Sequence, residues 1–145
     1  MNAISPRGQA WLDSGFSIWQ MPGAFIPLVA PFFFRESDDD LVFRVEIGAE
    51  HCNGAGTAHG GFLATIADVV LGYNINHRIP KEWRIATSNL SIQFLVPALP
   101  GQWVEGKLDR IKIGKRLCHA SGTLDMEGIP VVAMHGIFAV LSDAR

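Results

Sequence analysis

The chain has 145 residues, a length that suits one domain. Its formal net charge at pH 7 is −2, which excludes the strongly basic surface that nucleic acid or an anionic membrane would attract. Hydrophobic residues make up 48% of the chain and the mean hydropathy is +0.21, so part of the apolar surface is expected to be buried between subunits.

Cysteine content and the apolar segments bear on the compartment. The two cysteines do not form a disulfide scaffold: Cys118 is predicted to be a buried strand residue and Cys52 a free thiol, which fits a reducing compartment. The first residues show no signal-peptide pattern, and three prolines interrupt the most apolar window, residues 22–34. We therefore expect a cytoplasmic protein without a membrane span. His51, Cys52 and His59 match no usual metal-ligand spacing, so no metal site is expected.

The N-terminal third is predicted to contain one helix and one hairpin. Residues 6–20 are expected to be helical, because Pro6 suits a first helical turn and apolar aromatic residues follow it. Residues 25–36 and 41–47 are expected to be strands joined by a tight acidic turn at residues 37–40.

The rest of the chain is predicted to form one long helix and four strands. The helix extends from His59 to His77, since Pro80 prevents its continuation, and it is apolar on nearly all sides until Asn74, which is typical of a buried helix. The strands are expected at about residues 83–96, 102–113, 116–126 and 130–141. The last strand is apolar on both faces, which places it at the centre of the sheet.

These elements predict an α+β domain in which an antiparallel curved sheet wraps around one long central helix, with an extra N-terminal helix. We expect a single domain over residues 1–145, with a helical arm at 1–24 and a core at 25–141.

A glycine-rich loop leads into the long helix, with the sequence Asn53-Gly54-Ala55-Gly56-Thr57-Ala58-His59-Gly60-Gly61. Glycines at a helix N-terminus leave backbone N–H groups unshielded, and together with the helix dipole these groups suit an oxyanion or a polarised carbonyl. The Gly60 N–H is our candidate donor. The loop could instead be only a flexible turn, with His59 as a capping residue. It lacks the third glycine and the βαβ context of a dinucleotide site.

Asp68 is a lone carboxylate in an apolar part of the same helix. Burying a carboxylate there costs free energy of folding, so the group is expected to have a partner or a role in function. It could be the partner of a structural ion pair. On a helical wheel it lies about 180° from His59, and its neighbours Ala64 and Gly72 are small. Asp68 and the Gly60 amide can therefore serve one site only if two copies of the helix supply them, which predicts a symmetric homo-oligomer.

Together these residues resemble the hotdog-fold thioesterases, and within them the PaaI-like type of phenylacetic acid degradation. The resemblance is carried by Asn53, Gly56, His59-Gly60-Gly61, Asp68, the strand that ends in Pro97-Ala98 and the hairpin Gly114-Lys115-Arg116. It covers about residues 25 to 141. It implies the hotdog fold and an acyl-CoA thioesterase that hydrolyses its substrate to free acid and CoA. It also implies a homodimer or homotetramer that needs no cofactor.

The resemblance also implies roles for individual residues. Asp68 would be the general base or the nucleophile, and the Gly60 N–H would be the oxyanion donor across a dimer interface. The substrate-binding residues would be Asn53, His59, Gly61 and Thr87. The phosphates of CoA need cations, and the clustered candidates are Arg110, Lys112, Lys115 and Arg116, although these could be only a solvated hairpin face. The acyl pocket is expected among Phe62, Ile66, Leu71 or neighbouring apolar groups.

The position of Thr87 presents a conflict. Simple strand alternation puts Thr87 on the same face as Asn89 and Ser91, away from Leu90. A β-bulge could direct Thr87 towards Asp68, or Ser88 could take its place.

Two other functions stay open. One is a hotdog-fold hydratase or dehydratase, which usually needs a His or carboxylate pair at the acyl α-carbon. Only His59 is close to Asp68 in sequence, and it points the other way. The other is a non-catalytic acyl-CoA or lipid-binding protein, against which the presence of Asp68 argues.

Overall fold

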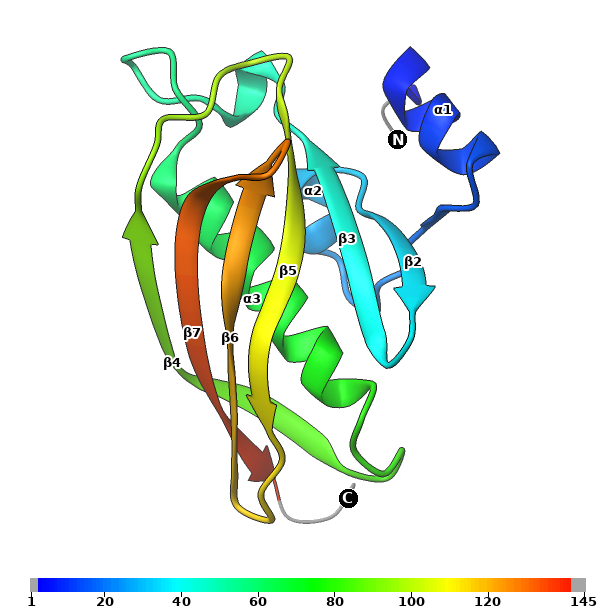
Figure 1. Ribbon diagram of the computed structural model, residues 1–145, viewed down its shortest axis with the longest axis vertical. Helices are drawn as coiled ribbons and strands as arrows, with labels where there is room; N and C mark the ends of the chain where they lie inside the picture. Colours follow the sequence, from blue (N-terminus) through cyan, green and yellow to red (C-terminus); the bar gives the residue numbers. More distant parts are fainter. Residues whose placement is uncertain (1–2, 142–145) are drawn as a thin grey trace.

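Seven antiparallel strands form the one sheet of the computed structural model, which describes residues 3–141. The strand order is β1-β2-β3-β5-β6-β7-β4, and the sheet curves around helix α3 (Gly60–Asn76) (Figure 1). The strands are β1 (Ser17–Ile18), β2 (Phe33–Ser37), β3 (Asp40–Glu46), β4 (Arg84–Phe94), β5 (Trp103–Lys112), β6 (Leu117–Met126) and β7 (Ile129–Leu141). The other helices are α1 (Pro6–Asp13), α2 (Ile26–Val29) and a 3₁₀ turn (Ala49–His51). This is the predicted α+β architecture.

The predicted N-terminal helix is too long. Helix α1 ends at Asp13, and Gly15 follows with a φ of 103°, a left-handed conformation that ends a helix. The chain then extends, so that Ser17 and Ile18 form β1 and pair with β2. Phe16 and Trp19 therefore flank an added edge strand of the sheet instead of lying on a helix.

The predicted strand over residues 25–36 is wrong in its first half. Residues Ile26–Val29 form the short helix α2, with Pro27 in its first turn, and β2 begins only at Phe33. The fixed φ of proline suits a first helical turn, whereas the apolar composition of this segment also fits a strand. The acidic turn is shorter than predicted, because Asp40 already pairs with Ser37 across the hairpin.

The predictions from His59 onwards are confirmed. Helix α3 spans the predicted segment, with His59 and His77 as its flanking caps, and the four later strands begin and end within two residues of their predicted limits. Strand β7 lies inside the sheet between β6 and β4, as its apolar faces predict. Strand β4, in contrast, is an edge strand. None of the helices within residues 3–141 has the length and apolar character that spanning a membrane requires.

Asn74 ties the central helix to β3. Its side chain is fully buried, accepts a hydrogen bond from the Leu41 N–H at 2.8 Å and donates to the Leu41 carbonyl at 3.0 Å. It also donates to the Val70 carbonyl at 2.9 Å. One side chain therefore satisfies both backbone groups of Leu41 at the start of β3.

Asn74→Ala is expected to lower the free energy of unfolding by about 3 kcal/mol, because it leaves a buried N–H and a buried carbonyl of Leu41 without partners. Urea denaturation measures the change. The matched control is Asn76→Ala in the same helix, where the side chain is exposed and a change within about 0.5 kcal/mol is expected. Equal stability losses in the two variants would contradict the role of Asn74.

Candidate functional site

Asn53 shapes the loop that precedes α3. Its Oδ1 accepts hydrogen bonds from the N–H groups of Ala55 at 3.0 Å and Thr57 at 3.2 Å, and its own N–H donates to the Thr57 carbonyl at 2.8 Å. Gly56 takes a φ of 80° within this turn, a conformation that favours glycine. The Asn53 amide is thus occupied within the loop, and its contact with a substrate stays a prediction.

His59 caps α3 and leaves one of the two following amides without a partner. Its Nδ1 accepts a hydrogen bond from the Gly61 N–H at 2.8 Å. Within residues 3–141, no acceptor forms a hydrogen bond with the Gly60 N–H. Of the two glycine amides, that of Gly60 is therefore the one that can bind an oxyanion, whereas Gly61 shapes the cap.

Gly60 lies beside the end of the edge strand β4. A Cβ atom at Gly60 would lie 3.1 Å from Cζ of Phe94, whose side chain is 56% exposed. The absence of a side chain at Gly60 thus lets a large exposed aromatic ring approach the helix N-terminus. Gly60 is half-buried between the exposed residues His59 and Gly61, so this end of the helix lies near solvent.

Asp68 and Thr87 form a hydrogen-bonded pair. The Thr87 Oγ1 donates to Asp68 Oδ1 at 2.7 Å. Thr87 pairs with Phe138 of β7 and Asn89 pairs with Ile137, so Ser88 is an extra residue in β4. This β-bulge directs Thr87 towards the helix, together with Ile85, whereas Leu90 and Ile92 face the helix after it. The bulge resolves the conflict in the sequence, and Thr87 rather than Ser88 contacts Asp68.

The Asp68–Thr87 pair lies in an open groove of about 540 Å³. The groove follows α3 towards its C-terminal end, and most of its walls are apolar or aromatic, including Tyr73, Trp83 and Phe138. The expectation that Ile66 and Leu71 line an acyl pocket is wrong, because both are buried in the core with exposures of 1% and 0%. Since α3 is apolar on nearly all sides, its sequence does not distinguish the groove face from the core face.

Phe62, the third residue expected to line the acyl pocket, lies outside this groove. Its ring stacks on that of His51, with centroids 4.0 Å apart, and it lines a different pocket together with His59. Trp83 and Arg84 also line the groove. The sequence does not identify them as site residues, because they belong to no motif and only the fold brings them close to Asp68.

Tyr73 supplies a further polar group to this groove. Burial raises the pKa of its phenol, the neighbouring Trp19 indole opposes the rise, and the negative charge of Asp68 adds to it. The Trp19 Nε1 is buried and has no hydrogen-bond partner among the described residues. Tyr73 is therefore a neutral phenol at neutral pH.

The two halves of the candidate site lie apart within one chain. His59 and Gly61 line a pocket that does not include Asp68. Gly60 and Asp68 are eight residues apart, which is about 12 Å along the helix axis. A carbonyl within hydrogen-bonding distance of the Gly60 N–H is thus out of reach of the Asp68 carboxylate in the same chain.

The predicted carrier-phosphate residues divide into two groups. Arg110 and Lys112 line a groove with His119 and His135, whose rings are 5.9 Å apart. Lys115 and Arg116 lie in the β5–β6 hairpin, beside the end of β7. None of these four cations lines the groove of Asp68, where Arg84 supplies the positive charge. Within residues 3–141, no three potential metal ligands come together.

The comparisons with known proteins give one consistent family. Residues 55–133 match the family model of the thioesterase superfamily. The curated relative "Putative esterase PA0474" of Pseudomonas aeruginosa is 34% identical over 128 residues, which cover 88% of this chain and 96% of that protein.

Solved structures share the fold. BH2602 of Bacillus halodurans, solved with CoA, is 27% identical with a TM-score of 0.69, over 77% of this chain and 74% of that chain. The E. coli PaaI protein from the phenylacetic acid degradation operon is 19% identical with a TM-score of 0.63, over 77% of this chain and 80% of that chain.

Proposed function

Because the chain belongs to the thioesterase superfamily and has its hotdog fold, we propose that it hydrolyses acyl-CoA thioesters to the free acid and CoA. The observation that carries this proposal is the Asp68–Thr87 pair at an apolar groove, with Thr87 Oγ1 2.7 Å from Asp68 Oδ1. A carboxylate held by a hydroxyl beside an apolar surface suits the hydrolysis of an apolar acyl group.

In this proposal Asp68 acts on the thioester carbonyl in one of two ways. In the first, it removes a proton from the attacking water, and the tetrahedral intermediate then expels the CoA thiolate, which takes up a proton. In the second, its carboxylate attacks the carbonyl and displaces the CoA thiolate to form a mixed anhydride, which water hydrolyses to the free acid and the regenerated carboxylate. The oxygen of the tetrahedral intermediate is stabilised by the Gly60 N–H of the partner subunit. In other acyl-transfer enzymes one such donor lowers the barrier by roughly 3–4 kcal/mol.

The proposed active unit is a homodimer, alone or within a tetramer. The separation of Gly60 from Asp68 along α3 supports a site shared by two copies of the chain. Strand β4 supports it as well, because it is an edge strand that carries Thr87 and ends at the exposed Phe94. An uncovered strand edge pairs readily with another strand.

Coenzyme A is the proposed carrier, and no further cofactor is required for the hydrolysis. BH2602, the 27% identical structure, was solved with CoA. Arg84 and the hairpin residues Lys115 and Arg116 are the nearest candidates for its phosphates, since the hairpin lies beside the end of β7 that pairs with the start of β4. Arg110 and Lys112 could contribute only to a carrier that follows the outer face of the sheet.

A thiol-release assay tests the proposed function. Short, branched, aromatic and long acyl-CoA thioesters are offered, and release of free CoA is followed over time. None of the five histidines of the described chain lines the groove of its own Asp68, so a hydratase would have to take its histidine from the partner subunit. Consumption of an enoyl-CoA without thiol release would indicate that hydratase, and tight binding without any turnover would indicate a carrier protein.

Thr87→Val is expected to lower kcat about tenfold or more, because it removes the hydroxyl that holds Asp68 at nearly constant side-chain volume. Thr87→Ser keeps the hydroxyl and is expected to stay close to wild type. Ser88→Ala is the neighbouring control, and steady-state hydrolysis of an acyl-CoA is the measurement. A larger loss in Ser88→Ala than in Thr87→Val would show that the wrong hydroxyl has been assigned.

A further inference from the structure

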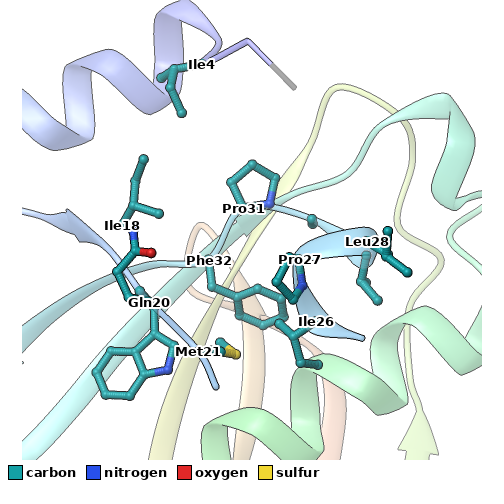
Figure 2. Close-up of a pocket in the computed structure, with 12 residues that line it drawn as sticks. Ile4, Ile18, Gln20, Met21, Ile26, Pro27, Leu28, Pro31 and Phe32 are labelled. Carbon is teal, nitrogen blue, oxygen red and sulfur yellow. The ribbon is translucent and has the colours of Figure 1, made fainter. Parts of the chain in front are cut away.

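A second, apolar pocket lies between the β1 region and the α2 segment (Figure 2). Its volume is about 160 Å³, and no charged residue lines it. Ile18 and Met21 contribute from one side, Pro31 and Phe32 from the other, as Figure 2 shows. An apolar cavity of this size is large enough for about six carbon atoms.

Only one turn of the chain separates this pocket from the groove of Asp68. The chain lines the pocket at Met21, lines the groove at Pro22 and Phe25, and lines both cavities at Ile26. Phe25 is 63% exposed and no residue of α2 is buried. The part of the boundary formed by Phe25 and Ile26 is thus a thin segment near the surface. Beside it, Trp19 of the pocket packs edge-on against Tyr73 of the groove, with ring centroids 5.1 Å apart, so Ile26 is the point at which the two cavities can join.

The exposed turn at residues 22–25 is the least packed part of the boundary. Gly23 takes a φ of 88° in the turn, and a Cβ atom there would contact nothing within 4 Å. Ile26 is half-buried and packs only partly against the core, so it can move with less loss of packing than a fully buried residue. Ile26 is therefore the side chain that stands between a ligand in the groove and the pocket.

We propose that this pocket is the distal end of the acyl site, and that Ile26 determines the chain length at which an acyl tail enters it. The inference rests on the proposed acyl-CoA thioesterase function. The ligand class is a straight, uncharged acyl chain that is longer than the groove, because most residues that line the pocket are apolar, Gln20 apart, and none is charged. Each methylene buried there is expected to strengthen binding about fourfold.

The experiment measures binding without turnover. Butyl, octyl and dodecyl thioethers of CoA, which cannot be hydrolysed, are titrated calorimetrically into the wild type and three variants. Ala30→Leu fills the pocket from a buried position that does not line the groove. Ile26→Ala removes most of the side chain that separates the pocket from the groove. Ile129→Ala is the matched control, since Ile129 is exposed and lines neither cavity.

For wild type, affinity is expected to rise at least about tenfold from octyl to dodecyl. Ala30→Leu should remove most of this rise and leave the butyl affinity unchanged, Ile26→Ala should enlarge it, and Ile129→Ala should match wild type. A flat wild-type profile, or a rise that Ala30→Leu leaves intact, overturns the assignment of the pocket. If Ala30→Leu fails to fold, the assignment is overturned when Ile26→Ala shows the same rise in affinity from octyl to dodecyl as wild type. Because thioethers report binding alone, the expected profile without thioester hydrolysis would refute the proposed function and not the pocket.

Discussion

Asp68→Asn is expected to lower kcat for thioester hydrolysis by at least about 100-fold, with little change in stability. The amide has nearly the same volume as the carboxylate, and its oxygen can still accept the hydrogen bond of Thr87. It can neither take a proton from water nor form an anhydride. The measurement is steady-state thiol release, with thermal unfolding and circular dichroism as checks on the fold.

The control for Asp68→Asn is the same substitution at Asp39, an exposed residue in the turn between β2 and β3. Asp39→Asn is expected to hydrolyse at the wild-type rate. If Asp68→Asn retained more than about one fifth of the wild-type kcat, Asp68 would be a structural partner of Thr87 and the proposed chemistry would need another base.

Mixed subunits are expected to recover activity that neither variant has alone. The first variant is Asp68→Asn, and the second is Gly60→Val, whose side chain would extend beside Phe94 and crowd the oxyanion position. In a mixed dimer, one site combines the intact Asp68 of one chain with the intact Gly60 of the other. Random exchange should therefore restore about one quarter of the wild-type activity.

Subunit exchange is followed in parallel with chains of different mass. Each variant mixed with itself is the control and should stay inactive. If exchange is complete and the mixture stays inactive, both groups act from within one chain, which the distance along α3 makes difficult to reconcile with a single carbonyl.

The helices and strands can be predicted from the sequence where the chain carries a regular pattern. The glycine loop, the uniformly apolar helix and the later strands, with turns near Gly101, Gly114 and Gly128, define most of the core to within two residues. The prediction fails between Ser14 and Phe32, where an apolar, proline-containing segment suits a strand and a short helix equally well. This wrongly predicted segment matters for the proposed acyl site, since it forms the boundary between the two cavities.

The candidate site shows the same division. Asp68 and the loop before α3 can be identified from the sequence, because a lone carboxylate and bare helix-start glycines are locally unusual. The groove walls come from Pro22, Phe25, Trp83 and Phe138, which only the tertiary fold brings together. Their grouping depends on topology, so no local pattern could reveal it.

The extra residue at Ser88 makes the site depend on the count of residues in β4 and not only on their identity. Side chains in a strand alternate between two faces, so deleting Ser88 would restore strict alternation and exchange the faces on one side of the deletion. Either Thr87 would turn to the outer face, or Leu90 and Ile92 would leave the core. A relative that keeps every residue type around Thr87 but lacks one position in this strand would keep the appearance of the motif without its geometry. Insertions and deletions here are therefore a better guide to a retained site than substitutions.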